Sequence, residues 1–230
     1  MSNFQAFDFT LENGKPYVLM QVDVNNSSLA AKCLIDSGNS DGLWLFQTQE
    51  NEIKVPDKNF DDYLGRGFSG AIYGKKAKVK QLSLGEFKLE QVITAFPDSV
   101  SLANVNLVDN RSGSIGGAVL KRFNAIFDYA NQKLYLKKNK FYAEKFTYNA
   151  TGIAVQHAGM QWSTEQIPVK SFETKQESLF NKENAQLNYN FKLLPVYEIF
   201  AVRKNSAAER AGLKSGDVLV SINGKDLSRL

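Results

Sequence analysis

The chain contains one short stretch whose residue types could perform acid–base chemistry: CLIDSGNSDGLWLF, residues 33–46. An apolar run leads directly into Asp36 and then into the small-residue turn Ser37-Gly38, after which the chain soon becomes apolar again. A carboxylate beside apolar strands is unfavourable unless hydrogen bonds or a partner compensate for its burial. The pattern therefore predicts an acid that the fold holds in a fixed position, as functional acids often are.

Composition and charge favour a globular protein that binds no nucleic acid. The 230 residues are 43% hydrophobic, enough to bury one sizeable core or two smaller ones in one to two domains. The formal net charge is only +4, and the lysines of KKAKVK, residues 75–80, alternate with Ala77 and Val79. This alternation is typical of a strand with one solvated face, so we expect no nucleic-acid surface.

Cys33 is the single cysteine of the chain, which excludes an internal disulfide and a cysteine-rich metal site. We expect it to pack as a small hydrophobic residue, and we expect neither a metal nor a cofactor. No apolar run is long enough to cross a bilayer, and the amino terminus, MSNFQAFDF, has no basic segment followed by a hydrophobic one. The sequence therefore favours either a cytoplasmic protein or one whose leader is absent from this chain.

Residues 1–145 have the pattern of a mainly β domain. In YVLMQVDV, residues 17–24, every second side chain is apolar, which predicts a strand with one buried face. The side chains expected on that face are Val18, Met20, Val22 and Val24. Further strands are expected over 79–96, and a short helix over 118–123 is expected to precede a hairpin over 124–138.

The remainder of the chain divides into a polar segment and a second unit. Residues 146–190 are rich in Asn, Gln, Glu and Ser and only weakly periodic, which favours irregular strands or a connecting segment. Within residues 191–230, Ser206 can cap a short helix that Gly212 ends, before a strand over 218–222.

Two later segments follow the Asp36 turn in an order that is informative. A glycine-rich hairpin spans residues 65–74, and GSIGGAVL, residues 113–120, is followed by IFDY, residues 126–129. Together the three elements resemble the retropepsin-like group of aspartic proteases over residues 7–140. The resemblance implies a closed β-barrel lobe that takes part in peptide-bond hydrolysis.

This resemblance assigns a role to each matching residue. Asp36 would be the catalytic acid and base, Ser37 would join the hydrogen bonds between two facing turns, and Gly38 would donate its N–H to the carboxylate. Ser40 could bond the outer carboxylate oxygen, whereas Asn39 departs from the small residue that is usual there. The expected flap residues are Gly65, Gly67, Phe68, Ser69, Gly70 and Tyr73, and the expected cleft wall is Ile115, Gly116 and Gly117.

The chain has only one such turn, although the chemistry of the family needs two. Two facing aspartates share one proton, because both cannot readily ionise so close together, and the pair activates the water that attacks the amide. Asp36 therefore needs a counterpart from a homodimer or from a missing upstream lobe, and we expect an isolated monomer to be inactive. An alternative is that Asp36 only caps a turn in a protein that kept the fold without the activity. Trp44 is expected in the core rather than in a substrate pocket.

NSAAERAGLKSGDVLVSINGK, residues 205–225, resembles the core motif of PDZ domains, with Ala207 in place of the usual proline. The matching residues are Ala208, Ala211, Gly212, Leu213, Gly216, Asp217, Ile222, Asn223 and Gly224. The resemblance implies capture of a peptide by strand addition. The helix and strand that would complete the peptide groove have no counterpart after Leu227, so we expect a partial PDZ domain.

A protease lobe followed by a PDZ domain resembles a group of bacterial, extracytoplasmic aspartyl proteases. The first hypothesis is therefore an aspartic endopeptidase lobe that acts on a peptide or protein substrate and carries a peptide-binding unit. The alternative is a catalytically inactive module that uses both parts for peptide binding or assembly.

Overall fold

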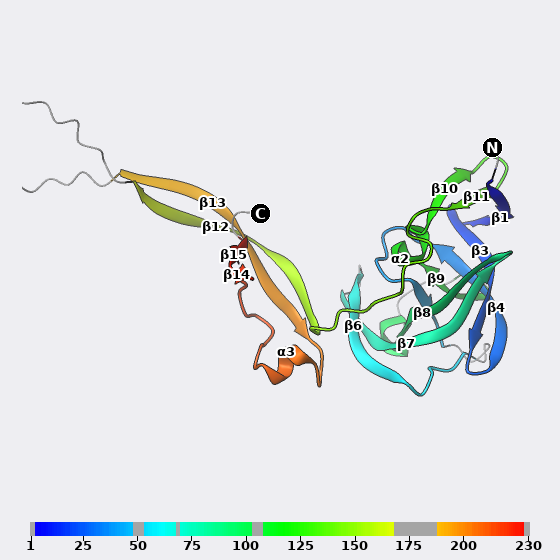
Figure 1. Ribbon diagram of the computed structural model, residues 1–230, viewed down its shortest axis with the longest axis horizontal. Helices are drawn as coiled ribbons and strands as arrows, with labels where there is room; N and C mark the ends of the chain where they lie inside the picture. The colour runs from blue at the N-terminus through cyan, green and yellow to red at the C-terminus, as the bar shows by residue number, and fades with distance from the viewer. Residues whose placement is uncertain (1–2, 48–52, 68–69, 103–107, 168–187, 228–230) are drawn as a thin grey trace, which may run out of the picture. The chain divides into compact units, whose positions relative to one another are not determined.

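The computed structural model describes residues 3–47, 53–67, 70–102, 108–167 and 188–227. These residues form two compact units, residues 1–150 and residues 151–230. In Figure 1 the first unit contains β1 to β11, and the second unit begins with β12.

The first unit is built almost entirely from strands. Its strands are β1 (Gln5–Asp8), β2 (Thr10–Glu12), β3 (Lys15–Val24), β4 (Ser27–Ile35), β5 (Leu43–Leu45), β6 (Asn59–Gly67), β7 (Gly70–Leu84), β8 (Phe87–Pro97), β9 (Arg111–Ile115), β10 (Phe123–Asp128) and β11 (Lys133–Lys138). In the described part of this unit, two short helices, α1 (Ser99–Leu102) and α2 (Gly117–Leu120), lie between strands in the sequence. The mainly β character that the sequence predicts is confirmed.

The larger sheet of this unit closes on itself. Its eight strands follow the order β2-β3-β4-β9-β5-β8-β7-β6, and β3 also pairs with β7. The additional pairing joins Gln21–Asp23 of β3 to Gln81–Ser83 of β7, so β3, β4, β9, β5, β8 and β7 form a ring. Strands β1, β11 and β10 form a separate three-stranded sheet.

The strand β3 shows why these residues fold as they do. Its four predicted inward side chains, at 18, 20, 22 and 24, are each no more than 3% exposed and belong to one continuous apolar core. Fully burying a side chain of this size stabilises the fold by about 1.5–3 kcal/mol. Cys33, on the paired strand β4, is fully buried in the same core, as expected.

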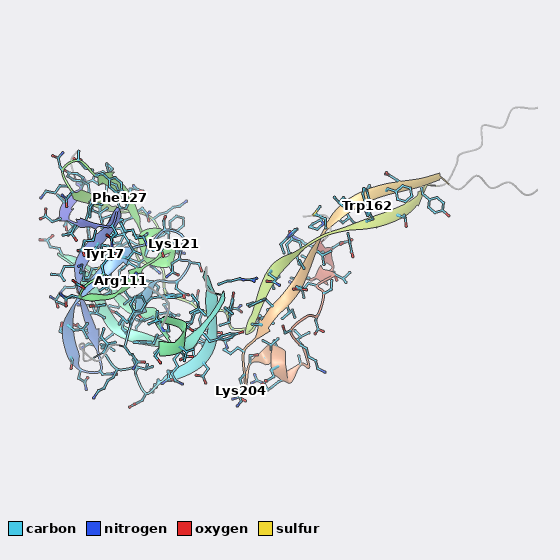
Figure 2. The ribbon with its side chains drawn as sticks, turned by 180° about the vertical axis from the view of Figure 1, so that it is seen from behind. Tyr17, Arg111, Lys121, Phe127, Trp162 and Lys204 are labelled. Atoms are coloured by element: carbon cyan, nitrogen blue, oxygen red, sulfur yellow. The ribbon has the colours of Figure 1, made fainter. Side chains whose placement is uncertain are left out.

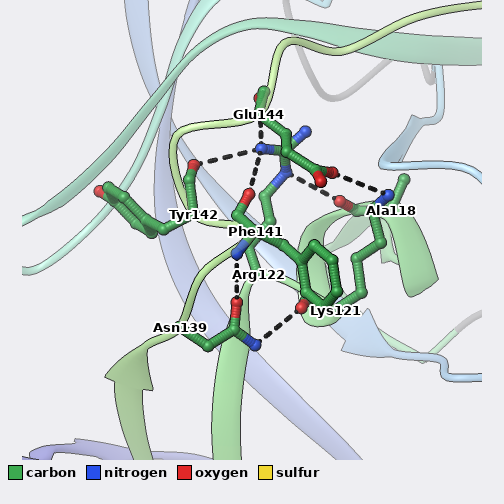
Figure 3. A network of polar contacts seen from close by, with 7 residues as sticks. All are labelled: Ala118, Lys121, Arg122, Asn139, Phe141, Tyr142 and Glu144. Carbon is green, nitrogen blue, oxygen red and sulfur yellow. Dashed lines mark hydrogen bonds and ion pairs between the residues drawn. The ribbon is translucent and has the colours of Figure 1, made fainter.

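Arg122, next to α2, fixes the chain that follows β11 (Figure 3). Its Nε donates to the carbonyl of Ala118 at 3.0 Å, and its Nη1 reaches the carbonyls of Phe141, Tyr142 and Glu144. The residue is 2% exposed, and its guanidinium lies 3.7 Å from the ring centroid of Phe146. Burial lowers the pKa of Arg122, and the charge of Glu144 acts in the opposite direction. A buried cation thus holds residues 141–146 against the unit through main-chain oxygens.

The second unit is dominated by a long antiparallel ribbon of β12 (Ile153–Ile167) and β13 (Asn188–Val202). Residues 146–190, expected to form irregular strands or a connecting segment, therefore include one long strand whose pairing is irregular at two places. The register shifts twice along the ribbon, between Ala154 and Val155 and between His157 and Met160. No described helix has both the length and the apolar character needed to span a membrane.

After the ribbon, the chain forms α3 (Ala207–Arg210), β14 (Ser221–Ile222) and β15 (Lys225–Asp226). Ser206 caps α3 as predicted, since its side chain accepts a hydrogen bond from the N–H of Glu209 at 3.1 Å. Gly212 follows with a φ of 85°, the left-handed conformation that ends many helices. The strand expected over 218–222 is shorter than predicted: it comprises Ser221–Ile222, with Val218 in an isolated bridge to Glu198.

Candidate functional site

The Asp36 turn is held by a strand that comes much later in the sequence. Strand β4 ends at Ile35, which pairs in parallel with Ile115 of β9. The N–H of Asp36 donates to the carbonyl of Ile115 at 2.9 Å, and the N–H of Gly38 donates to Oδ1 of Asp36 at 3.0 Å. Asp36 is half-buried. A main-chain carbonyl therefore fixes the backbone of Asp36, and a main-chain N–H fixes its carboxylate, as the sequence pattern predicts for a positioned acid.

Asp36 lines a cavity of about 330 Å³ that also receives residues of the glycine-rich hairpin formed by β6 and β7. The cavity is lined by Asp36, Gly38, Asn39, Ser40, Trp44, Phe46, Leu64, Gly65, Arg66, Gly67, Ile72, Ser101, Leu102, Arg111 and Ser114. Trp44, expected in the core, is half-buried and forms part of this wall. The acid and the hairpin thus face one cavity.

The predicted flap residues divide into three groups. Gly65 and Gly67 line the cavity, whereas Gly70 and Tyr73 do not. Tyr73 is 48% exposed and its ring packs edge-on against Tyr63, with 5.6 Å between the centroids. Phe68 and Ser69 lie outside the described residues.

The two serines predicted to support Asp36 differ in position. Ser40 lines the cavity with Gly38, although its side chain is exposed. Ser37 is also exposed, and it lies outside the cavity lining.

The three residues assigned to the cleft wall are not among the residues that line this cavity, and the two glycines form backbone hydrogen bonds to residues 39–42. The N–H of Gly116 donates to the carbonyl of Gly42 at 3.0 Å, and the N–H of Gly117 donates to the carbonyl of Asn39 at 2.6 Å. A β-carbon on Gly116 would lie 2.4 Å from the carbonyl oxygen of Asp41, so only glycine fits there. Ile115 is buried in the core. These residues support the turn, and Ser114 and Arg111 of the same strand line the cavity.

A charged network missed by sequence reasoning ties the hairpin to the turn. Lys76 Nζ lies 2.9 Å from Asp41 Oδ1 and 3.7 Å from Asp62 Oδ2. The indole N–H of Trp44 donates to Asp41 Oδ2 at 2.8 Å, and Asn39 Oδ1 accepts from the N–H of Asp41 at 2.9 Å. The side chains of the three charged residues are only 14–16% exposed. Lys76 belongs to the KKAKVK run expected on a solvated face, and its carboxylate partners come from other strands and loops, so local alternation could not identify it.

Arg111, which lines the cavity, is another residue that the sequence analysis did not identify. Its Nε donates to the carbonyl of Gly113 at 3.1 Å, and its Nη2 donates to Ser114 Oγ at 2.7 Å. The guanidinium lies 5.0 Å from the ring centroid of Phe46 and 6.0 Å from that of Tyr17, beside which Figure 2 shows it. Burial lowers the pKa of Arg111, while Tyr17, Cys33 and Asp36 raise it electrostatically. An arginine still carries its charge at neutral pH.

Within the described residues, no three or more His, Cys, Asp or Glu side chains come together as metal ligands. Cys33 is a free thiol, and complete burial raises its pKa from 9.0 to about 12. It is therefore a poor nucleophile in the folded protein.

In the second unit, the loop that contains Gly216 and Asp217 of the PDZ-like motif is hydrogen-bonded to Ile199 of β13. The N–H of Ile199 donates to the carbonyl of Asp217 at 2.9 Å, and the N–H of Gly216 donates back to the carbonyl of Ile199 at 2.8 Å. The carboxylate of Asp217 closes the turn by accepting from the N–H of Lys214 at 2.8 Å. The Gly-Asp pair of the motif thus positions this loop through backbone contacts.

Comparison with known proteins gives a family match in the second unit, at residues 198–230. No curated protein matches the chain. No family match supports an aspartic protease lobe in the first unit, so that resemblance rests on the residues and geometry described above. Residues 198–230 match the family model of the PDZ domain, which confirms the resemblance at the carboxyl-terminal end of the chain.

Proposed function

We propose that the first unit is one half of an aspartic peptide hydrolase and that the PDZ region binds peptides or partner proteins. The observation that supports the hydrolase is the half-buried Asp36 carboxylate, which accepts a hydrogen bond from the N–H of Gly38 in a cavity that the β6–β7 hairpin also lines. A cavity of about 330 Å³ is of the size that small-ligand and side-chain sites occupy.

Hydrolysis of a peptide bond in this way requires a second aspartate beside Asp36. The sequence has a single Asp-Ser-Gly and no Asp-Thr-Gly, so the second aspartate comes from another copy of this chain or from another lobe. The two carboxylates share one proton; the ionised one removes a proton from a water molecule while the other donates to the amide. Gly38 keeps the Asp36 carboxylate oriented through its 3.0 Å hydrogen bond.

A peptide-binding function without hydrolysis is the second candidate, and the PDZ match favours it. PDZ domains bind an extended peptide as an added strand, where main-chain hydrogen bonds provide affinity. This function requires no acid at Asp36.

Cleavage of a peptide library by the whole chain distinguishes the two candidates. We expect Asp36→Asn to reduce cleavage by about 10²–10⁴-fold, the usual contribution of an acid–base group. The matched control is Asp109→Asn, at an exposed position outside the cavity lining, which should leave cleavage unchanged. If two copies form the site, the specific activity should also rise with protein concentration.

Cleavage that survives Asp36→Asn would refute the hydrolase. If peptides bind but no cleavage occurs at any concentration, including when a second lobe is supplied, the binding module is the function of this chain.

A further inference from the structure

We propose that Arg111 makes the Asp36 cavity selective for peptides that place a carboxylate beside the bond to be cut. The carboxylate could belong to an Asp or Glu side chain or to a free carboxyl terminus. The inference deepens the proposed function and rests on it, since it names the substrate class of the same cavity.

The charges around the cavity support this preference. Among the described residues that line it, Asp36, Arg66 and Arg111 are the charged ones, so two cations accompany one carboxylate. The remaining walls include Trp44, Leu64 and Ile72, which can pack against the aliphatic part of a substrate side chain. An entering carboxylate is therefore attracted, whereas an entering Lys or Arg side chain is repelled.

Arg111 is held in place and keeps donors free for a ligand. Guanidinium has five N–H donors in a planar fork, and the described contacts of Arg111 use one on Nε and one on Nη2. Packing against Phe46 restricts its rotation and removes water from one of its faces. A fixed, partly desolvated guanidinium is suited to bind a carboxylate through two parallel hydrogen bonds.

The charge of Arg111 is not neutralised by the acid already in the cavity. The two groups sense each other electrostatically, since Asp36 raises the pKa of Arg111. Even so, no ion pair within 4.0 Å joins them in the described part of the chain. Both groups are therefore available, Asp36 to a water molecule and Arg111 to a substrate carboxylate.

Binding can be measured in the whole chain with Trp44 as the reporter. The chain has two tryptophans, and Trp162, which is 72% exposed in the other unit, can be replaced by phenylalanine. In this background, with Asp36→Asn to prevent turnover, the probes are four peptides of one sequence. They carry either Glu or Gln and end in either a free carboxylate or an amide, which separates the two sources of the carboxylate.

We expect at least one carboxylate peptide to bind about 10-fold or more tightly than its neutral partner, as a charge-assisted hydrogen-bond pair provides. Arg111→Met should bring the ratio of these two affinities close to one, and Arg111→Lys should keep part of the preference for the carboxylate. Arg66→Met, at an exposed hairpin position, should change the ratio less than Arg111→Met does. Slow chemical labelling of the buried Cys33 thiol verifies that each variant is folded. If Arg111→Met is not folded, Arg111→Gln takes its place.

The outcomes of binding and cleavage are separable. If nothing is cleaved but the ratio depends on Arg111, the hydrolase fails and this inference stands. If the intact chain cleaves peptides while the ratio is near one, or is unchanged in Arg111→Met, the inference is overturned and the hydrolase stands.

Discussion

The two units of this chain differ in how much apolar surface they bury. The first buries a continuous apolar core that includes Leu43, Leu45 and Leu134, each fully inaccessible to solvent. In the second, the described apolar side chains that are buried are Ile199, Ala208 and Leu227. Its motif residues Val218 and Val220 are 53% and 71% exposed.

This contrast shows which interactions carry each structure. Burial of apolar surface is the main favourable term in folding, so the first unit should unfold as one cooperative block. The second relies on the ribbon hydrogen bonds, the Ser206 cap and the turns around Asp217, and should open locally with a smaller free energy. Asp36 lies on the unit with the larger buried core, and the PDZ motif lies on the unit with fewer buried apolar side chains.

Thiol labelling gives the largest expected difference between the units. With its pKa raised to about 12, Cys33 has on the order of 10³-fold less thiolate than an ordinary thiol, and it is also inaccessible. Ser221→Cys, at an exposed position of the second unit, should label fast in the same protein. A single fast phase for both thiols would contradict the rigidity of the first unit.

The Cys33 thiol should also make the stability of the first unit depend on pH. The thiol ionises in the unfolded chain near pH 9.0 but in the folded chain only near 12, so stability should fall as the pH rises through that interval. Chemical denaturation at several pH values measures it. Cys33→Ala should remove this part of the slope.

Gly113→Ala should disrupt the first unit next most strongly. A β-carbon there would lie 1.8 Å from the carbonyl oxygen of Trp44, where β5 and β9 pair. We expect a loss of about 4 kcal/mol or more in its free energy of unfolding. Gly159→Ala, where nothing lies within 4 Å but φ is +97°, should cost only about 1 kcal/mol, in the second unit. Hydrogen exchange followed by segment would show whether each loss stays within its own unit.

Arg122→Met should cost the first unit about 3 kcal/mol, because the main-chain oxygens of Ala118, Phe141 and Tyr142 lose a charged donor that is itself buried. Lys121→Met is the neighbouring control: its 3.4 Å pair with Glu144 is about half exposed, so solvent screening leaves it a contribution of about 0–1 kcal/mol. Equal effects of the two substitutions on the unfolding midpoint would show that the Arg122 contacts do not hold residues 141–146.

Ser206→Ala is expected to have the smallest effect, about 1 kcal/mol in the second unit, through loss of the helix cap. Exchange of the Glu209 amide should accelerate, while Cys33 labelling should not change. Faster Cys33 labelling would mean that the two units unfold together.

Sequence reasoning worked where the cause of structure is local. The alternation of Val18 and Val22 predicts one buried face of β3, and Ser206 followed by Glu209 predicts a capped helix; both are confirmed. The Asp36 turn could be located because a carboxylate between apolar runs needs nearby donors, and Gly38 supplies one.

It failed where the cause lies far away in the chain. Strand β12 is long because β13 pairs with it over most of its length, although its own residues show little periodicity. Arg111 and Lys76 acquire their importance from Phe46 and Asp41, which other segments bring to them. The sequence could not show that Ile115 anchors the backbone of Asp36, because this contact depends on the parallel pairing of β4 with β9.

That parallel pairing also bears on the order of events during synthesis. The backbone of Asp36 is anchored by the carbonyl of Ile115, and the N–H of Gly117 donates to the carbonyl of Asn39 in the same turn. A ribosome releases the bend long before it releases these anchors, so the emerging chain cannot yet hold the carboxylate in its final orientation. The turn can therefore take its final form only after translation has passed residue 117, and pairing with a second carboxylate must come later still.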